Sequence, residues 1–128
     1  MEGTLIPYDS KFDPPAPVVE VMLSNVRNRR LHVKLPAILD TAADITAIPQ
    51  SVLDRLKLYQ VSQISVEGVD GISNYLKTYQ VRLKVATLTL PQLQIIPVSF
   101  EFVVLARDVL NQLVVHLDGP GLTFTIGE

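Results

Sequence analysis

In the segment Leu39-Asp40-Thr41-Ala42-Ala43-Asp44, an aspartate directly follows an apolar run and is itself followed by small residues, as in a turn. An aspartate at the end of a strand has a rigid base from which its carboxylate can be aimed. The small residues after it would let a substrate backbone come close. The alternative interpretation is a structural turn, in which the aspartate side chain bonds its own backbone. Taken alone, the stretch leaves both interpretations open.

The segments around this turn have the pattern of short β-strands. Residues 18–23 and 31–35 flank a polar connection, as the two arms of a hairpin would. Residues 79–85 alternate between apolar and polar side chains, which places one face on a core and the other in water. Asp70-Gly71 supplies the positive φ angles that a tight hairpin turn requires. Several antiparallel pairs are therefore expected.

Helical patterns are few and short. Ser51 is expected to cap a short helix over residues 52–56. Residues 107–113 have apolar side chains at helical spacing, for two turns at most. Strand patterns surround both segments, and a last hairpin is expected over residues 114–126. The sequence therefore predicts an all-β fold, a small closed barrel with one short C-terminal helix.

Length and composition indicate one folded domain. The chain has 128 residues, of which 48% are hydrophobic and 19% charged, enough to bury a single core. Residues 1–17 hold four of the nine prolines, which favours an extended N-terminal arm. The domain is therefore expected over residues 18–128. The arm could be a tether, an edge-covering strand or a segment removed by self-cleavage.

The composition also bears on location. The N-terminal residues do not combine a basic stretch with an apolar core, as a signal peptide does. The longest uncharged run, residues 85–100, is interrupted by prolines and glutamines and is too short to cross a bilayer. The chain has no cysteine, which fits a reducing compartment. We therefore expect a cytoplasmic protein with no membrane partner.

Several function classes lack support in the sequence. Eleven Lys and Arg against thirteen Asp and Glu give a net charge of -2, so no positive field would attract nucleic acid. Arg27, Arg29 and Arg30 cluster on a hairpin connection and leave nucleic-acid binding as the weakest alternative. His32 and His116 are isolated, which makes a metal site improbable. Neither a Gly-x-Ser-x-Gly motif nor a phosphate-binding glycine loop occurs.

A second motif lies more than sixty residues after the aspartate turn, at Ala106-Arg107-Asp108-Val109-Leu110. The order Asp-Thr-small-Ala-Asp, an apolar Ile-Thr-Ala-Ile-Pro run, a glycine-bearing hairpin and this second motif resembles the retropepsin-like aspartic proteases. That family comprises the retroviral proteases and their cellular and bacterial relatives. The resemblance covers about residues 18–126. It implies an acid-protease barrel that functions as a homodimer and cleaves peptide or protein substrates.

The resemblance implies a role for each residue that matches the family motifs. Asp40 would be the catalytic aspartate, followed by Thr41, which would tie the two active-site loops together across the dimer, and by Ala42. Asp44 and Arg107 match positions that form an ion pair bracing the site. The hairpin tip would close over substrate as a flap; its residues are Gly68, Val69, Asp70 and Gly71. No metal or organic cofactor is implied.

Physical chemistry supports a dimer independently. Peptide hydrolysis by aspartates needs two carboxyl groups about 3 Å apart that share one proton. Asp40 and Asp44 cannot provide them, because residues four apart on an extended chain are separated by about 13 Å. A two-fold axis would bring Asp40 next to its counterpart in a second chain. The pair would titrate as one unit, which predicts a bell-shaped pH profile with an acidic to mildly acidic optimum.

Two alanines depart from the family pattern. Ala42 and Ala106 stand where the family normally has glycine. Each is tolerated if its φ is negative and strained by about 1 kcal/mol or more if φ is positive. A catalytically weakened dimer that binds peptides or supports assembly is therefore the alternative to an aspartic endopeptidase. Residues 122–126, a terminal strand with an edge that needs a partner, are expected to contribute to the dimer sheet.

Overall fold

The structure, a computed structural model, describes residues 3–128. Two short helices and ten strands are found in this range. The strands are β1 (Thr4–Pro7), β2 (Val18–Ser24), β3 (His32–Leu39), β4 (Ala47–Pro49), β5 (Tyr59–Glu67), β6 (Ser73–Val85), β7 (Leu88–Val98), β8 (Val103–Leu105), β9 (Val114–Asp118) and β10 (Thr123–Gly127). The helices are α1 (Gln50–Arg55) and α2 (Arg107–Leu110). Neither helix is long and apolar enough to cross a membrane.

Six strands close into a barrel, as predicted. They follow the order β2-β3-β8-β4-β7-β6, and a further pairing of β6 with β2 closes the ring. β3 runs parallel to β8, and β4 runs parallel to β7. β2 pairs with β3, and β6 with β7, in antiparallel orientation. The β3–β8 pairing brings the aspartate turn, which follows β3, and the second motif, which follows β8, to the same place in the barrel.

The barrel interior is filled by the alternating side chains of its strands. Val81, Leu83 and Val85 of β6 are at most 1% exposed, whereas Lys84 between them is exposed. The alternation predicted for residues 79–85 is therefore confirmed. Burial of branched apolar side chains of this size stabilises the fold by roughly 1.5–3 kcal/mol each. β2 and β3 form the hairpin expected from residues 18–35.

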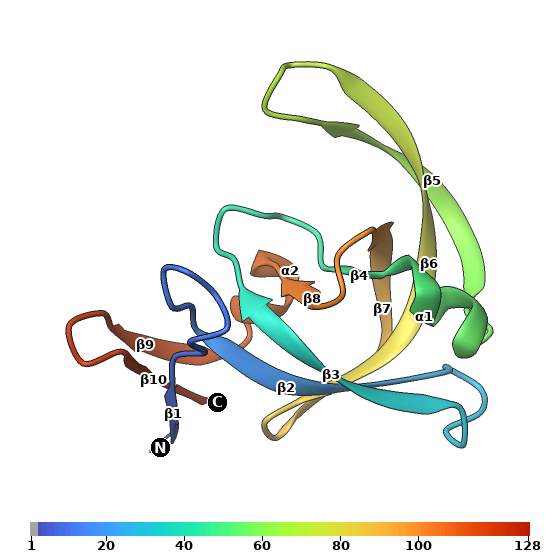
Figure 1. Ribbon diagram of the computed structural model, residues 1–128. Helices are drawn as coiled ribbons and strands as arrows, with labels where there is room; N and C mark the ends of the chain where they lie inside the picture. Colours follow the sequence, from blue (N-terminus) through green and yellow to red (C-terminus); the bar gives the residue numbers. More distant parts are fainter. Residues whose placement is uncertain (1–2) are drawn as a thin grey trace.

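A second, three-stranded sheet lies against the barrel (Figure 1). Its order is β1-β10-β9, so β10 is the central strand and has a neighbour on each side. Residues 122–126 therefore do not present a free edge, contrary to the sequence-based expectation. The last hairpin itself is confirmed, with Phe124 and Ile126 of β10 buried in the core.

The N-terminal residues extend the fold before Val18. β1 pairs with β10, and the Tyr8 ring lies 6.1 Å from the ring of Phe124. Ala16 is buried and forms an isolated bridge with Asp9. Of the three roles considered for the arm, an edge-covering strand describes its arrangement in this structure.

Helix α1 begins earlier than predicted. Its N-cap residue is Pro49, and Gln50 is its first helical residue. Ser51 makes no capping hydrogen bond, so the expected cap is wrong. The φ of Pro49, -57°, leads the chain directly into the helix. After α2, the expected late helix, the chain continues through turns to Leu113.

A long hairpin of β5 and β6 projects beyond the barrel (Figure 1). Its tip closes through hydrogen bonds from the Gly68 amide to the Ile72 carbonyl oxygen and from the Gly71 amide to the Gly68 carbonyl oxygen, each 3.0 Å. Gly71 has a φ of 79°, a conformation that a side chain would strain. The hairpin turn predicted at Asp70-Gly71 is therefore confirmed, but only Gly71 supplies a positive φ; Asp70 does not.

Candidate active site

Asp40 stands directly after the end of β3. Ile38 lies opposite Val104 and Leu39 opposite Leu105 in the parallel pairing of β3 with β8. The Asp40 amide continues this ladder by donating to the Leu105 carbonyl oxygen at 2.9 Å. Two paired strands thus hold the backbone of the aspartate, which is the rigid support expected of a catalytic residue.

The carboxylate of Asp40 also shapes its own turn. Its Oδ1 accepts a hydrogen bond of 2.9 Å from the Ala42 amide, and the side chain is half-buried. The turn interpretation is therefore correct for the local geometry. It does not exclude chemistry, because this bond engages Oδ1 alone. Thr41 and Ala42 are exposed beside the carboxylate, at a face open to a second molecule.

The two alanines that replace family glycines are not strained. Ala106 is fully buried and has a φ of -95° and a ψ of -177°, an extended conformation open to any residue. Within residues 3–128, the non-glycine residues with positive φ are Lys57, Ala86 and Leu122. The φ of Ala42 is therefore not positive. Both methyl groups are accommodated without backbone strain.

Arg107 braces the aspartate loop, but its partner differs from the predicted one. Its guanidinium Nη1 donates to the Thr41 carbonyl oxygen at 2.7 Å, and its amide donates to the Ala43 carbonyl oxygen at 3.0 Å. The predicted ion pair with Asp44 is absent: in the described part of the chain, Lys34 and Glu20 form the one ion pair within 4.0 Å. Asp44 is exposed, where water solvates its charge and an ion pair adds little.

A buried bond network around Thr46 was missed by the sequence analysis. Asp108 Oδ2 accepts from the Thr46 amide at 2.9 Å, and Asp108 Oδ1 accepts from Thr46 Oγ1 at 2.6 Å. The same hydroxyl oxygen accepts from the Ala106 amide at 3.1 Å. Thr46 is fully buried, so each of these polar groups depends on the others. The available signal was a threonine inside an apolar run.

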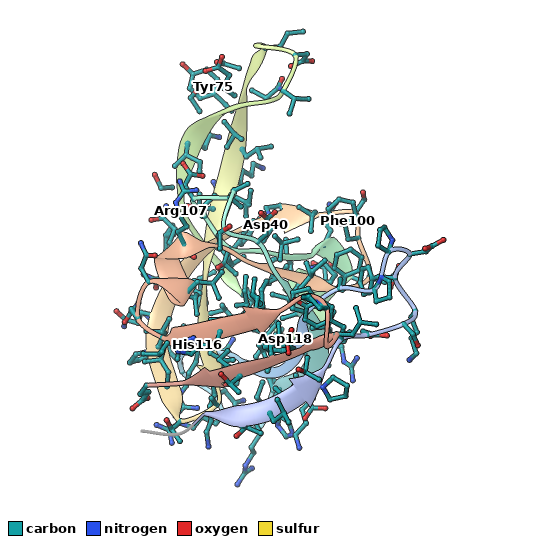
Figure 2. All side chains as sticks on the ribbon, turned by 90° about the vertical axis from the view of Figure 1, so that its left-hand side faces the viewer. Asp40, Tyr75, Phe100, Arg107, His116 and Asp118 are labelled. Carbon is teal, nitrogen blue, oxygen red and sulfur yellow. The ribbon has the colours of Figure 1, made fainter. Side chains whose placement is uncertain are left out.

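The long hairpin stands over the aspartate loop. Figure 2 shows Asp40 and Arg107 near its base and Tyr75 near its outer end. A cavity of about 460 Å³ lies between hairpin and loop, lined by Asp44, Ile45, Ile64, Ser65, Val66 and Glu67. The predicted flap residues are all exposed at the hairpin tip.

The remaining candidates lie apart from this loop. His32 and His116 are exposed, and the His32 ring nitrogen Nδ1 contacts the Arg29 carbonyl oxygen at 3.1 Å. The Arg27 guanidinium lies 5.1 Å from the centre of the Tyr59 ring. Across residues 3–128, no three acidic or histidine side chains are grouped so that they could hold a metal ion.

A closed barrel of six strands that sets one Asp-Thr turn beside an Ala-Arg-Asp segment, below a long hairpin, has the architecture of a retropepsin-like aspartic protease. The family model described as "Retroviral aspartyl protease" matches residues 14–118. The chain therefore belongs to the retroviral aspartyl protease family. Among curated protein sequences, none matches it significantly.

Solved structures of similar fold include retroviral proteases. The solution structure of the simian foamy virus (mac) protease has a TM-score of 0.56 and 16% identity, covering 74% of this chain and 92% of that one. The equine infectious anaemia virus (EIAV) protease in complex with the inhibitor HBY-793 has a TM-score of 0.54 and 22% identity, covering 76% and 86%. The foamy viral protease-reverse transcriptase in complex with an RNA/DNA hybrid has a TM-score of 0.54 and 17% identity, covering 75% and 12%. These likenesses show the fold.

Proposed function

We propose that the protein is an aspartic endopeptidase whose active site forms between two copies of the chain. The observation that carries this proposal is the position of Asp40, half-buried at the end of a paired strand, on a loop braced by Arg107. One Asp40 carboxylate would take a proton from water as the water oxygen attacks the peptide carbonyl carbon. The protonated Asp40 of the partner subunit would donate its proton to the carbonyl oxygen. The Asp40 that took the water proton would then protonate the amide nitrogen, while the other Asp40 takes a proton back from one hydroxyl of the tetrahedral intermediate. The C–N bond breaks, the amine leaves, and the pair again shares one proton.

One chain does not provide a second suitable carboxylate. Asp108 is occupied by two hydrogen bonds from Thr46, and it holds the loop instead of facing it. Asp44 is exposed and lines the cavity under the hairpin, and among the described residues it makes no hydrogen bond with Asp40. The dyad therefore requires the second copy. A two-fold axis beside the exposed Thr41 would supply it.

The substrate would bind as an extended strand between the loop and the hairpin. Extended peptides are recognised by backbone hydrogen bonds, with pockets for alternate side chains. The walls of the cavity include Ile45, Ile64 and Val66, which suit an apolar side chain. The hairpin tip, with Gly68 and Gly71 at its turn, would act as the flap that covers the peptide.

The alternative function is a peptide-binding or assembly module without catalysis. It was suggested by Ala42 and Ala106, which could have strained the active-site loop. The extended backbone of Ala106 and the absence of positive φ at Ala42 remove that argument for lost activity. Asp40, Thr41 and Arg107 are also joined in one compact arrangement, which supports the enzyme over the inert module.

Cleavage of a diverse peptide mixture tests the proposal. The purified protein and the Asp40→Asn variant would be incubated between about pH 4 and pH 8 and the products identified by mass spectrometry. Asparagine keeps the shape of the side chain but cannot act as a base, so cuts that require Asp40 establish the enzyme. If both proteins are dimers and neither cuts at any pH, the peptide-binding module replaces it.

A further inference from the structure

We propose that two copies of the chain join through the free edge of β9, and that strand β1 remains paired within its own chain. The two three-stranded sheets would then form one continuous sheet in the order β1-β10-β9-β9-β10-β1. This inference rests on the proposed function, because the second Asp40 must come from another chain. It names the surface that brings the second copy to the site.

The terminal sheet has two edges, and they differ in chemistry. β9 pairs with β10 on one side, and none of its five residues is a proline, so its backbone can pair fully. β1 forms the opposite edge, has four residues and ends at Pro7, which lacks an amide hydrogen. A proline and a short length are typical of edges that do not accept a further strand. The β9 edge is the one suited to a partner.

The side chains of β9 point to the same conclusion. Leu117 lies opposite Phe124 and Val115 opposite Ile126 in the pairing with β10. Phe124 and Ile126 are 1% and 2% exposed, because this face of β10 lies on the core. Leu117 is on the same face of the sheet and is nevertheless 56% exposed. Val115 is half-buried against the core, so the core of one chain ends between Val115 and Leu117.

The uncovered face continues to the aspartate loop. A groove of about 210 Å³ joins the two, lined by Leu39, Thr41, Leu110, Asn111, Leu113, Val115 and Leu117. One end of the groove is thus β9, and the other is the residue after Asp40. An antiparallel β9–β9 contact is isologous, so one two-fold axis would extend the sheet and bring the two aspartate loops together. A second copy of the chain would both pair with the free β9 edge and bring a second Asp40 to the aspartate loop.

β1 is built into its own chain. Its four residues pair in order with residues 123–126. A Cβ atom on Gly3 would lie only 2.8 Å from the Ile126 carbonyl oxygen, which shows how closely the two backbones approach. Ile6 and Tyr8 pack against the core of the same chain. These contacts are complete within one chain, so a dimer joined through β9 keeps them without exchange of β1.

Two matched substitutions test the edge. Leu117→Lys places a charge in the proposed interface, and Leu5→Lys places the same charge on β1, where Leu5 is 66% exposed. Sedimentation equilibrium should show a dimer dissociation constant raised at least about tenfold by Leu117→Lys and by less than about twofold by Leu5→Lys. Thermal unfolding of the two monomers should be alike, since both side chains are largely exposed. A dimer weakened by Leu5→Lys and not by Leu117→Lys would overturn the inference.

A disulfide tests whether β1 is exchanged. The chain has no cysteine of its own, and Leu5 and Thr125 are direct cross-strand partners. Directly opposed residues of antiparallel strands are about 4.5–5.5 Å apart, within disulfide range. After oxidation, Leu5→Cys/Thr125→Cys should run as a monomer on a denaturing, non-reducing gel. A covalent dimer would show exchange and contradict the inference.

These outcomes are separate from those of the cleavage assay. If the wild type is a dimer weakened by Leu117→Lys but cuts no peptide, the interface stands and the proposed activity fails. If the wild type cuts peptides while Leu117→Lys leaves both dimer and activity intact, the activity stands and the β9 interface is wrong. A protein that remains monomeric at every concentration tested also contradicts the interface.

Discussion

The carboxylate of Asp108 accepts two hydrogen bonds from Thr46, one from its backbone amide and one from its hydroxyl group. The two residues are 62 positions apart in the sequence. Their contact joins α2 to the end of the aspartate loop. The hydroxyl oxygen of Thr46 also accepts a hydrogen bond from the Ala106 amide. The loop that carries Asp40 is therefore held at one end by strand pairing with β8 and at the other by this buried network.

Removing the Thr46 hydroxyl group should destabilise the fold. Thr46→Val keeps the shape of the side chain but leaves the Ala106 amide and Asp108 Oδ1 without this partner in a buried site. We expect a loss of about 2 kcal/mol in the free energy of unfolding, measured with urea. Thr46→Ser, which retains the hydroxyl, should cost less. Equal losses in both variants would show that the methyl group matters more than the network.

Replacing Arg107 and Asp44 by uncharged residues should have different effects on activity and stability. Arg107→Gln removes the bond from Nη1 to the Thr41 carbonyl oxygen and should lower kcat/KM about tenfold by loosening the loop. Its effect on stability should stay below about 1 kcal/mol, because the side chain is exposed. Asp44→Asn should change stability by less than about 0.5 kcal/mol, since no ion pair is lost. A similar loss of unfolding free energy in both variants would indicate that Asp44 and Arg107 form the predicted ion pair after all.

Restoring the family glycine at position 106 should weaken the protein. Ala106 is fully buried with a negative φ, so glycine would lose methyl burial and add freedom to the unfolded chain. The two effects together predict a loss of about 1–2 kcal/mol in unfolding free energy. A stabilised Ala106→Gly variant would mean that the alanine is strained after all.

The hairpin tip should contribute to substrate binding and not to folding. Val69 is fully exposed, so Val69→Ser should leave the unfolding free energy unchanged within about 0.5 kcal/mol. If the tip covers the peptide, the variant should raise KM several-fold with kcat little altered. Val61→Ser, an exposed position on β5 away from the turn, is the control. Equal KM values for both variants would argue against a flap.

The features that the sequence predicts are those encoded within a few residues. The alternation of residues 79–85 predicts the buried face of β6, and Asp70-Gly71 predicts the hairpin turn. The Asp-Thr motif likewise needs only a short window. Such signals depend on local geometry, where side-chain period and φ preference decide the structure.

Features that depend on distant contacts were not predictable. The pairing of β1 with β10 joins the two ends of the described chain, and its proline-rich surroundings indicate an arm. Arg107 donates to a carbonyl oxygen, and because every residue carries such an acceptor, no residue type marks this partner in the sequence; the pairing with Asp44 was implied by the family resemblance. The φ angles of Ala42 and Ala106 also depend on the tertiary fold. These are the points at which the site differs from its sequence-based description.

The central claim is that each active site uses one Asp40 from each of two chains. Wild-type protein would be mixed with tagged Asp40→Asn chains at constant total concentration, with subunit exchange verified by mass spectrometry. We expect peptide cleavage to fall with the square of the wild-type fraction, to about a quarter in an equal mixture, because a mixed pair lacks one carboxyl group. A linear fall, to about half, would show that each chain is active by itself and would contradict the shared dyad.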